Sequence, residues 1–212
     1  MVSLALRAVV LLPLLLLGCR VATIVPIESK GTGNEKATFD AAARVDALWV
    51  QDVPNALARA VDLGEFVPAF DLDPEAAGAK WGRREGAGPY HVVVRGEGRV
   101  TAVDASSRTG TATLVIAVPG GTGTVRLQIG PVLRGTSIRD ALPTVSFDQF
   151  VNQIEYADIA NGLNARVEGE LLVTLQREAL EGRQLKLTGI VTLSGDEILT
   201  ITPVQLEVGG EP

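Results

Sequence analysis

The chain contains a single histidine and a single cysteine, which excludes most chemistry that needs pairs or clusters of these side chains. A zinc or redox-metal site requires several imidazole or thiolate ligands. A Ser-His-Asp triad would have to use His91, and the G-x-S-x-G turn that presents such a serine is absent. His91 alternates with Tyr90 and Val92 in a strand-like run, so we predict an ordinary strand residue. The sequence therefore predicts no metal, no cofactor and no catalytic residue.

Polar side chains that could bind a ligand concentrate in the segment 128–164. Arg134 and Arg139 carry planar guanidinium groups, which grip carboxylates on a ligand or within the protein itself. Asp140 is close enough in sequence to neutralise one of them. The candidate ligand- or partner-binding residues are Arg108, Gln128, Arg134, Thr136, Arg139, Asp140, Asn152, Gln153 and Glu155.

Two other roles are open for the same polar side chains. They could hold a long loop onto the rest of the fold through buried hydrogen bonds. Alternatively, Asp140 and Glu155 could form the acid/base pair of a hydrolase or lyase. The carboxylate hypothesis needs the two groups within about 10 Å of each other in an open cleft. The hypothesis fails if the Asp140 carboxylate is paired with Arg139.

The sole cysteine, Cys19, ends an apolar segment at the start of the chain. Arg7 precedes a run of about ten apolar residues, which suits a secretory signal and is too short to cross a bilayer. Leu16-Leu17-Gly18-Cys19 resembles the bacterial lipobox, with Leu17 larger than the usual residue. We predict that residues 1–18 are a signal peptide and that Cys19 carries lipid chains, including a palmitate-type acyl group. Two or more such chains anchor a protein stably.

The alternative for Cys19 is a small buried hydrophobe. No second cysteine is present to form a disulfide, and a lone thiol at the end of an export signal favours lipidation.

The charge balance excludes nucleic acid as the main partner. The chain has 19 basic and 25 acidic residues, for a net charge of −6. Removing residues 1–18 takes away Arg7 and no acid, which makes the mature chain more negative still. Two Trp, two Tyr and five Phe are too few for a platform that stacks single-stranded bases.

The elements that must position these side chains are first helical and then extended. Apolar residues recur at spacings of three and four from Thr38, which predicts an amphipathic helix that Pro54 ends or kinks. We expect a second short helix over 55–63, closed by Gly64, and mostly loop over 65–89 with a helical turn after Pro74. Further on, Ser146 and Gln149 form a capping box that predicts a helix starting at Ser146.

Strand-like runs follow from residue 90. They cover 90–95, 99–104, 111–118, 124–129, 170–176, 184–193 and 197–208. The glycine-rich segment 120–123 predicts a hairpin turn, and Pro203 marks the last strand as an edge or bent strand.

Three strands, a helix and two or three further strands is the order of a five-stranded oligonucleotide/oligosaccharide-binding (OB) barrel. We therefore predict an α+β, mainly β fold: an OB-like barrel with an inserted capped helix, preceded by an N-terminal helical segment. The expected parts are a signal peptide over 1–18, a lipidated anchor and linker over 19–37, a helical segment and loop over 38–89, and the barrel domain over 90–212.

Two long strings, LQIGPVLRGTSIRDA over 127–141 and FDQFVNQIEYA over 147–157, resemble a bacterial family of predicted periplasmic lipoproteins known as domain of unknown function 2291. Supporting features are CRVATIVPI over 19–27, Trp49 and the SSRTG turn over 106–110. The resemblance covers nearly the whole mature chain.

The resemblance implies an OB-type barrel tethered to a membrane in the periplasm or cell envelope. Family members often lie beside sugar-type ABC import systems, and the family supplies no proven activity. We therefore expect a non-enzymatic binding or accessory protein. Its partners would be the membrane, through the lipid anchor, and a sugar-type ABC transporter or its solute-binding protein. The alternative is a carboxylate-dependent hydrolase or lyase acting on a periplasmic saccharide.

Overall fold

The computed structural model of the protein describes residues 39–195 and 198–209. Cys19, the predicted signal peptide over 1–18 and the predicted linker over 20–37 lie outside the described residues. The chain from Phe39 onward forms one compact unit. Within the described ranges, no helix combines the length and the apolar character that a membrane span requires.

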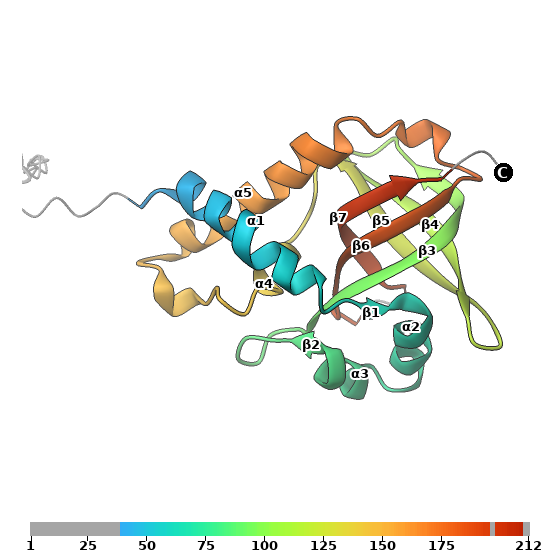
Figure 1. Ribbon diagram of the computed structural model, residues 1–212, viewed down its shortest axis with the longest axis horizontal. Helices are drawn as coiled ribbons and strands as arrows, with labels where there is room; N and C mark the ends of the chain where they lie inside the picture. The colour runs from blue at the N-terminus through green and yellow to red at the C-terminus, as the bar shows by residue number, and fades with distance from the viewer. Residues whose placement is uncertain (1–38, 196–197, 210–212) are drawn as a thin grey trace, which may run out of the picture. The chain divides into compact units, whose positions relative to one another are not determined.

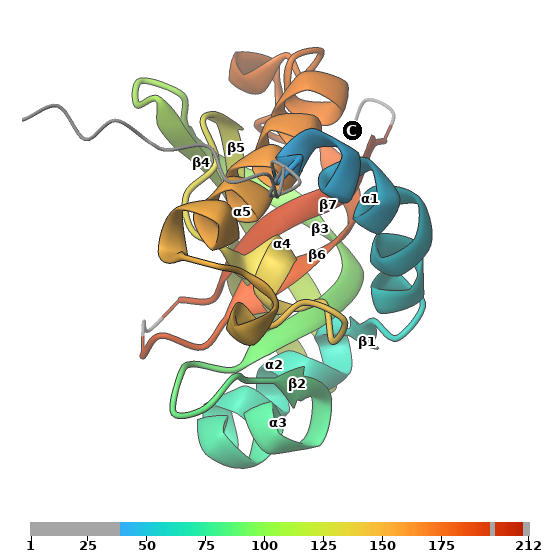
Figure 2. The ribbon, with the colours of Figure 1, turned by 90° about the vertical axis from the view of Figure 1, so that its left-hand side faces the viewer.

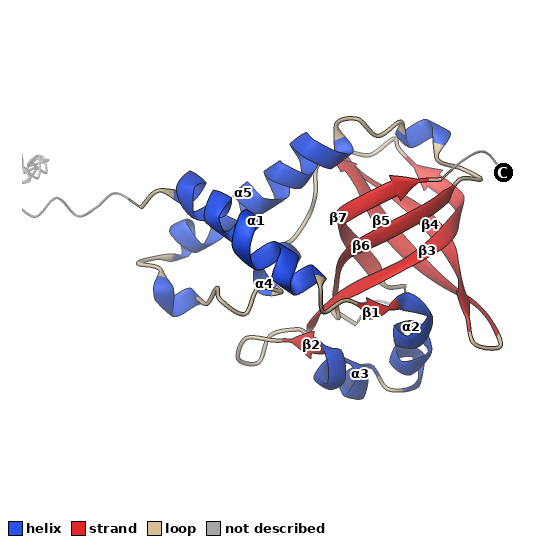
Figure 3. Ribbon diagram, in the orientation of Figure 1, coloured by secondary structure: helices blue, strands red, loops and turns tan. Residues whose placement is uncertain are grey.

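Five strands close into a barrel (Figure 3). They are β3 (His91–Asp104), β4 (Thr109–Val118), β5 (Gly121–Pro131), β6 (Gln184–Thr192) and β7 (Thr200–Val208). The ring runs β3-β4-β5-β7-β6, and pairing of β6 with β3 completes it. Neighbours are antiparallel except β5 and β7, which run parallel and pair only through Arg126 with Thr200 and Leu127 with Ile201. This order and closure confirm the predicted OB-like five-stranded barrel.

The first barrel strand corrects one expectation. The runs 90–95 and 99–104 belong to a single strand, β3, and the segment 96–98 between them is not a turn. β3 pairs with β6 along its first part and with β4 along its second. Its glycines allow close approach: a Cβ on Gly98 would lie 2.9 Å from the carbonyl oxygen of Val115, and one on Gly96 would lie 3.0 Å from Leu63 Cβ.

The remaining strands follow the sequence pattern more closely. β4 and β5 form the predicted hairpin, although β5 begins at Gly121, so that most of the glycine-rich segment is strand. β7 is irregular beside Pro203, where the register with β6 shifts between Thr188 and Gly189. β7 is not an edge strand, because it pairs on both sides.

Three helices and two short strands precede the barrel (Figure 1). They are α1 (Ala41–Leu57), β1 (Val61–Asp62), α2 (Leu63–Leu72), α3 (Pro74–Trp81) and β2 (Gly82–Arg83). α1 continues through Pro54 to its end, so the predicted helix over 55–63 is wrong. The predicted loop over 65–89 is wrong over 65–83, where α2, α3 and β2 lie; the helical segment after Pro74 and the loop over 84–89 are confirmed. Asp62 and Asp73 accept hydrogen bonds from backbone amides at the starts of α2 and α3, which are capping signals that the glycines nearby obscured.

A second helical group lies between β5 and β6. It contains α4 (Ser137–Asp140), the 3-10 turn η2 (Phe147–Gln149), α5 (Gln153–Val167), the π turn η3 (Glu168–Leu172) and the 3-10 turn η4 (Arg177–Ala179). α5 starts seven residues later than predicted, because the Asn152 side chain accepts from the amides of Ile154 and Glu155. Ser146 bonds to Asp148 instead. The predicted strand over 170–176 is wrong, since the helical path continues through η3 with Leu172 buried.

The apolar side chains form two cores. One fills the barrel and extends to α2 and α3, with Phe66 and Leu127 fully buried. The other lies between α1, α4, α5 and the outer surface of β6 and β7, with Leu48, Ile138 and Leu163 at its centre. Figure 2 shows α4 over the strands of the barrel, beside α5. The second core therefore fixes the segment after β5 against the outside of the barrel.

Candidate functional site

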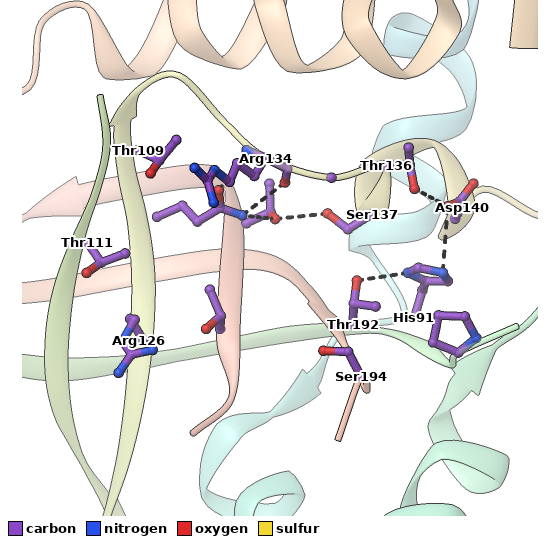
Figure 4. A pocket seen from close by; sticks show the side chains of 15 residues that line it. His91, Thr109, Thr111, Arg126, Arg134, Thr136, Ser137, Asp140, Thr192 and Ser194 are labelled. Carbon is purple, nitrogen blue, oxygen red and sulfur yellow. Dashed lines mark hydrogen bonds and ion pairs between the residues drawn. The ribbon is translucent and has the colours of Figure 1, made fainter. Parts of the chain in front are cut away.

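A cavity of about 580 Å³ lies outside the barrel, under the segment that leads from β5 into α4. Alternate residues of a strand point to opposite faces of a sheet. In the barrel, one set of alternate residues is apolar and points inward, and it includes Leu127 and Ile201. The outward set lines the cavity (Figure 4): Thr109, Thr111, Arg126, Gln128, Thr200 and Thr202. Its volume is in the range of small-molecule sites.

Hydrogen bonds, partly or fully buried, join the segment over the cavity, residues 132–136 (the roof), and α4 to side chains of β5 and β7. Gln128 Oε1 accepts from the backbone amide of Arg134 at 2.8 Å, and Gln128 Nε2 donates to the Arg134 carbonyl at 3.2 Å. Gln128 Nε2 also donates to Thr202 Oγ1 at 2.8 Å, and Ser137 Oγ donates to the same Thr202 oxygen at 2.9 Å. Gln128 therefore has the loop-holding role that was one alternative from the sequence.

The helix α5 and its extension η3 hold the same roof from the other side. Asn164 Nδ2 donates to the carbonyl of Gly135 at 2.9 Å, and Glu168 Oε1 accepts from the amide of Leu133 at 2.7 Å. The roof is thus fixed by side chains from β5 and from α5, although most of its own residues are exposed.

His91 closes one end of the cavity. Its Nδ1 lies 3.1 Å from Thr192 Oγ1, and its Nε2 lies 3.7 Å from Asp140 Oδ2. Burial lowers the pKa of His91, against the opposing effect of the Asp140 carboxylate, and the positive charges of Arg83 and Arg139 lower the pKa further. The expected state at neutral pH is therefore an uncharged imidazole.

Asp140 is fully engaged inside the protein. Arg139 donates to its Oδ1 from Nε at 2.7 Å and from Nη2 at 2.6 Å, and Thr136 donates to Oδ2 at 2.5 Å. The Tyr156 hydroxyl donates to Asp140 at 3.3 Å and to Glu85 at 3.1 Å. Burial, followed by the Asp140 charge, raises the pKa of Tyr156 to about 12, so the phenol stays protonated as a donor.

The guanidinium of Arg139 is also part of this internal network. It lies 3.5 Å from the ring centroid of Tyr156 and donates to the Tyr156 carbonyl at 3.0 Å. Arg139 is buried and does not line the cavity. Its contacts are those of a structural cation–π and ion-pair group.

The structure contradicts the hypothesis that Asp140 and Glu155 form an acid/base pair. Two hydrogen bonds from Arg139 hold the carboxylate of Asp140, so this group is not free. Glu155 accepts from the amide of Val151 beside the start of α5. The structure therefore does not support these two groups as a free acid and base.

The candidate residues from the sequence separate into two groups. Gln128, Arg134, Thr136 and Asp140 line the cavity. The others lie elsewhere: Arg139 is buried beside Asp140, Arg108 lies in the β3–β4 turn with its carbonyl accepting from Val132, and Asn152, Gln153 and Glu155 lie at the start of α5. Any binding role for these residues stays a prediction.

Sequence reasoning missed most of the cavity wall. The lining residues not anticipated are Pro89, His91, Thr109, Thr111, Arg126, Gly135, Ser137, Thr192, Ser194, Thr200 and Thr202. In sequence, the signal was a polar residue at every second position of β4, β5 and β7, which is also typical of an ordinary solvent-facing strand. For metals, residues 39–195 and 198–209 contain no group of three His, Cys, Asp or Glu side chains placed to hold an ion.

One of three similar solved structures shows the same fold. A crystal structure of an OB-fold protein from Thermotoga maritima is 20% identical and covers 81% of this chain and 99% of its own, with a TM-score of 0.63. At this identity the likeness shows the fold alone. The S. pombe Stn1–Ten1 complex (12% identity, 57% and 60% of the two chains) and an OBody bound to hen egg-white lysozyme (14%, 57% and 84%) have TM-scores of 0.25 and 0.26, too low to carry an argument. No curated protein matches the chain.

The family comparison covers most of the protein. The family model described as Predicted periplasmic lipoprotein (DUF2291) matches residues 9–207. This range includes Cys19, all five barrel strands almost to their end, and the roof of the cavity. The match confirms the resemblance seen in the sequence and the expected envelope location: the chain belongs to this family of predicted periplasmic lipoproteins.

Proposed function

We propose that the protein is a non-enzymatic accessory lipoprotein that binds a small polyhydroxylated solute in the cavity beside β5 and β7. Residues 1–18 would be removed, and Cys19 would carry the lipid that tethers the body to the membrane. The link to sugar-type ABC import, through the transporter or its solute-binding protein, is the part of this proposal that rests on the family resemblance.

The observation that carries the proposal is the density of side-chain hydroxyls around the cavity. Thr111 and Thr200 line it from β4 and β7, and across the ranges 39–195 and 198–209 neither hydroxyl has a hydrogen-bond partner. A threonine hydroxyl both donates and accepts, as the hydroxyls of a sugar or polyol do. The internal contacts of Gln128, Thr202 and Ser137 fix the cavity before any ligand arrives, which lowers the entropic cost of binding.

The test is calorimetric titration of the mature chain, in detergent micelles, against neutral sugars, sugar acids, polyols and the purified solute-binding protein of a neighbouring importer. Thr111→Val removes one cavity hydroxyl with little change of shape. Because one hydrogen bond contributes about 0.5–1.5 kcal/mol, we expect affinity for the solute to fall about two- to tenfold.

Thr113→Val is the matched control. Thr113 lies two residues along β4 on the same outward face, and it does not line the cavity. Affinity should be unchanged in this variant. If the folded chain binds no solute in the panel, or if both variants weaken binding equally, the proposed site is wrong.

A further inference from the structure

We infer that the solute bound in this cavity is an anion: a small polyol bearing a carboxylate or phosphate group, held between Arg126 and Arg134. The inference concerns the same cavity and rests on the proposed function, for which it names the class of ligand.

The first observation is that the guanidinium groups of Arg126 and Arg134 are unpaired. Arg126 is half-buried on the wall formed by β5, and Arg134 projects from the roof segment (Figure 4). Neither side chain has a hydrogen bond or ion pair with any other residue that the structure describes. A partly buried cation normally finds a partner within the protein.

The other partly buried arginines that the structure describes have hydrogen-bond or ion-pair partners within the protein. Arg83 donates to the carbonyls of Asp140 and Val145, and Arg177 donates to the carbonyl of Gly130 at 2.7 Å. Arg139 is paired with Asp140. Arg126 is therefore an exception among side chains of its kind, and it occurs at the cavity.

The second observation is the charge of the cavity lining. Asp140 is the one acidic residue among the described residues that line the cavity, and its two oxygens accept hydrogen bonds from Arg139, Thr136 and Tyr156. Within the ranges 39–195 and 198–209, no acidic side chain therefore compensates the positive charges of Arg126 and Arg134. A concave positive site attracts small anions and repels small cations, even on a protein whose net charge is −6.

The third observation is the arrangement of donors around Arg126. In the parallel pairing of β5 with β7, Arg126 is the register partner of Thr200, and both residues line the cavity. Thr111 is the register partner of Gln128 on the other side of β5. An arginine fork binds an oxyanion through two parallel hydrogen bonds, and the neighbouring hydroxyls are placed to bind the hydroxyls of the same ligand.

The experiment compares matched ligands with the mature chain in micelles. Glucuronate and glucose 6-phosphate test the carboxylate and phosphate forms of the anion, glucose is the neutral counterpart, and inorganic phosphate is an anion without a polyol. We expect at least one acidic sugar to bind roughly tenfold or more tightly than glucose, with an affinity that falls as salt rises from about 0.05 to 0.5 M.

Variants assign the effect to the arginine. Arg126→Gln removes the charge and breaks no side-chain hydrogen bond or ion pair within the described residues, so the fold should persist, which a thermal melt checks. We expect roughly tenfold or greater loss of affinity for the acidic sugar and little change for glucose. Arg59→Gln is the control, because Arg59 is exposed, has no side-chain partner in the described structure and lies outside the cavity.

The outcomes separate the two proposals. If glucose binds as tightly as the acidic sugars and Arg126→Gln changes neither, the anion inference is overturned while the proposed function stands. If inorganic phosphate binds in an Arg126-dependent way and no sugar binds, the anion assignment is kept and the polyol function is overturned. If the folded chain binds none of the four ligands, both are wrong.

Discussion

His91 is a titratable residue that the fold buries away from water. It is 7% exposed and is faced by Asp140, Arg83 and Arg139, while Thr192 bonds its other nitrogen. Burial dominates, so the folded protein holds the imidazole neutral at a pH where the unfolded chain begins to protonate it. The neutral ring then keeps the end of the cavity from becoming still more positive.

This difference gives the first prediction. The pKa of His91 is lowered in the folded state from its ordinary value of 6.5. Between that value and the lowered pKa the unfolded state binds more protons than the folded state, so the free energy of unfolding falls as pH falls through this window and levels off below it. His91→Gln should remove this contribution and make the pH dependence of stability shallower between about pH 7.5 and 5.

Urea unfolding of both proteins across that pH range measures the effect. Gln can still bond Thr192, so a modest offset in stability at pH 7.5 is tolerable. Equal slopes in the two proteins would show that His91 does not carry the expected proton linkage.

Some residues of the cavity could be predicted from the sequence and others could not. Arg134 and Asp140 stood out because polar residues are dense around them. Arg126 and Thr200 did not, since each is a single polar residue in an alternating strand. They become part of one wall only because β5 and β7, far apart in the chain, pair in parallel under the roof.

At the scale of elements, α5 shows why boundaries are hard to predict. Ser146 and Asn152 are both good N-cap residues, and each is followed by a suitable helical pattern. Aromatic contacts decide between them: Phe150 packs against Phe39 and Tyr156, and Phe147 packs against Tyr156. These contacts hold the chain before Asn152 outside the helix, and no local pattern in the sequence encodes them.

The contact between α1 and α5 gives the second prediction. Gly162 lies in α5 against Val45 of α1, and a Cβ on Gly162 would lie 2.6 Å from Val45 Cγ2. In an exposed helix Gly→Ala stabilises by about 1 kcal/mol. Here we expect Gly162→Ala to destabilise the protein instead, because the stiff, branched Val45 cannot move aside without separating the two helices.

Val45→Ala provides the control. It removes the methyl groups that clash, so Gly162→Ala should become neutral or stabilising in that background. Chemical unfolding of the native chain, both single variants and the double variant gives the coupling energy. A coupling near zero would mean that the helices do not pack through Gly162.

At the scale of the whole molecule, the closed barrel makes the site rigid. The barrel has no free edge along its ring, and the roof is tied both to β5 and to α5. The order of strands and helix was enough to predict this architecture, because few folds place a capped helix between three strands and two more. The N-terminal helices were predicted poorly, since α2 and α3 begin at Asp caps amid the glycines and prolines that favour loop.

The last prediction concerns attachment of the whole protein. The chain belongs to a family of predicted periplasmic lipoproteins, and its lone cysteine follows the lipobox-like Leu16-Leu17-Gly18. If Cys19 is the acylated residue, cells given labelled palmitate should incorporate label into the native chain and none into Cys19→Ser, which should also keep residues 1–18.

The control variant is Ser29→Ala, which leaves Cys19 in place and should label normally. Label in Cys19→Ser would place the lipid elsewhere, and an unlabelled native chain, with an N-terminal peptide of unmodified mass, would contradict lipidation at this residue. Because two or more acyl chains anchor a protein stably, labelling confined to Cys19 would assign the tether to this single side chain.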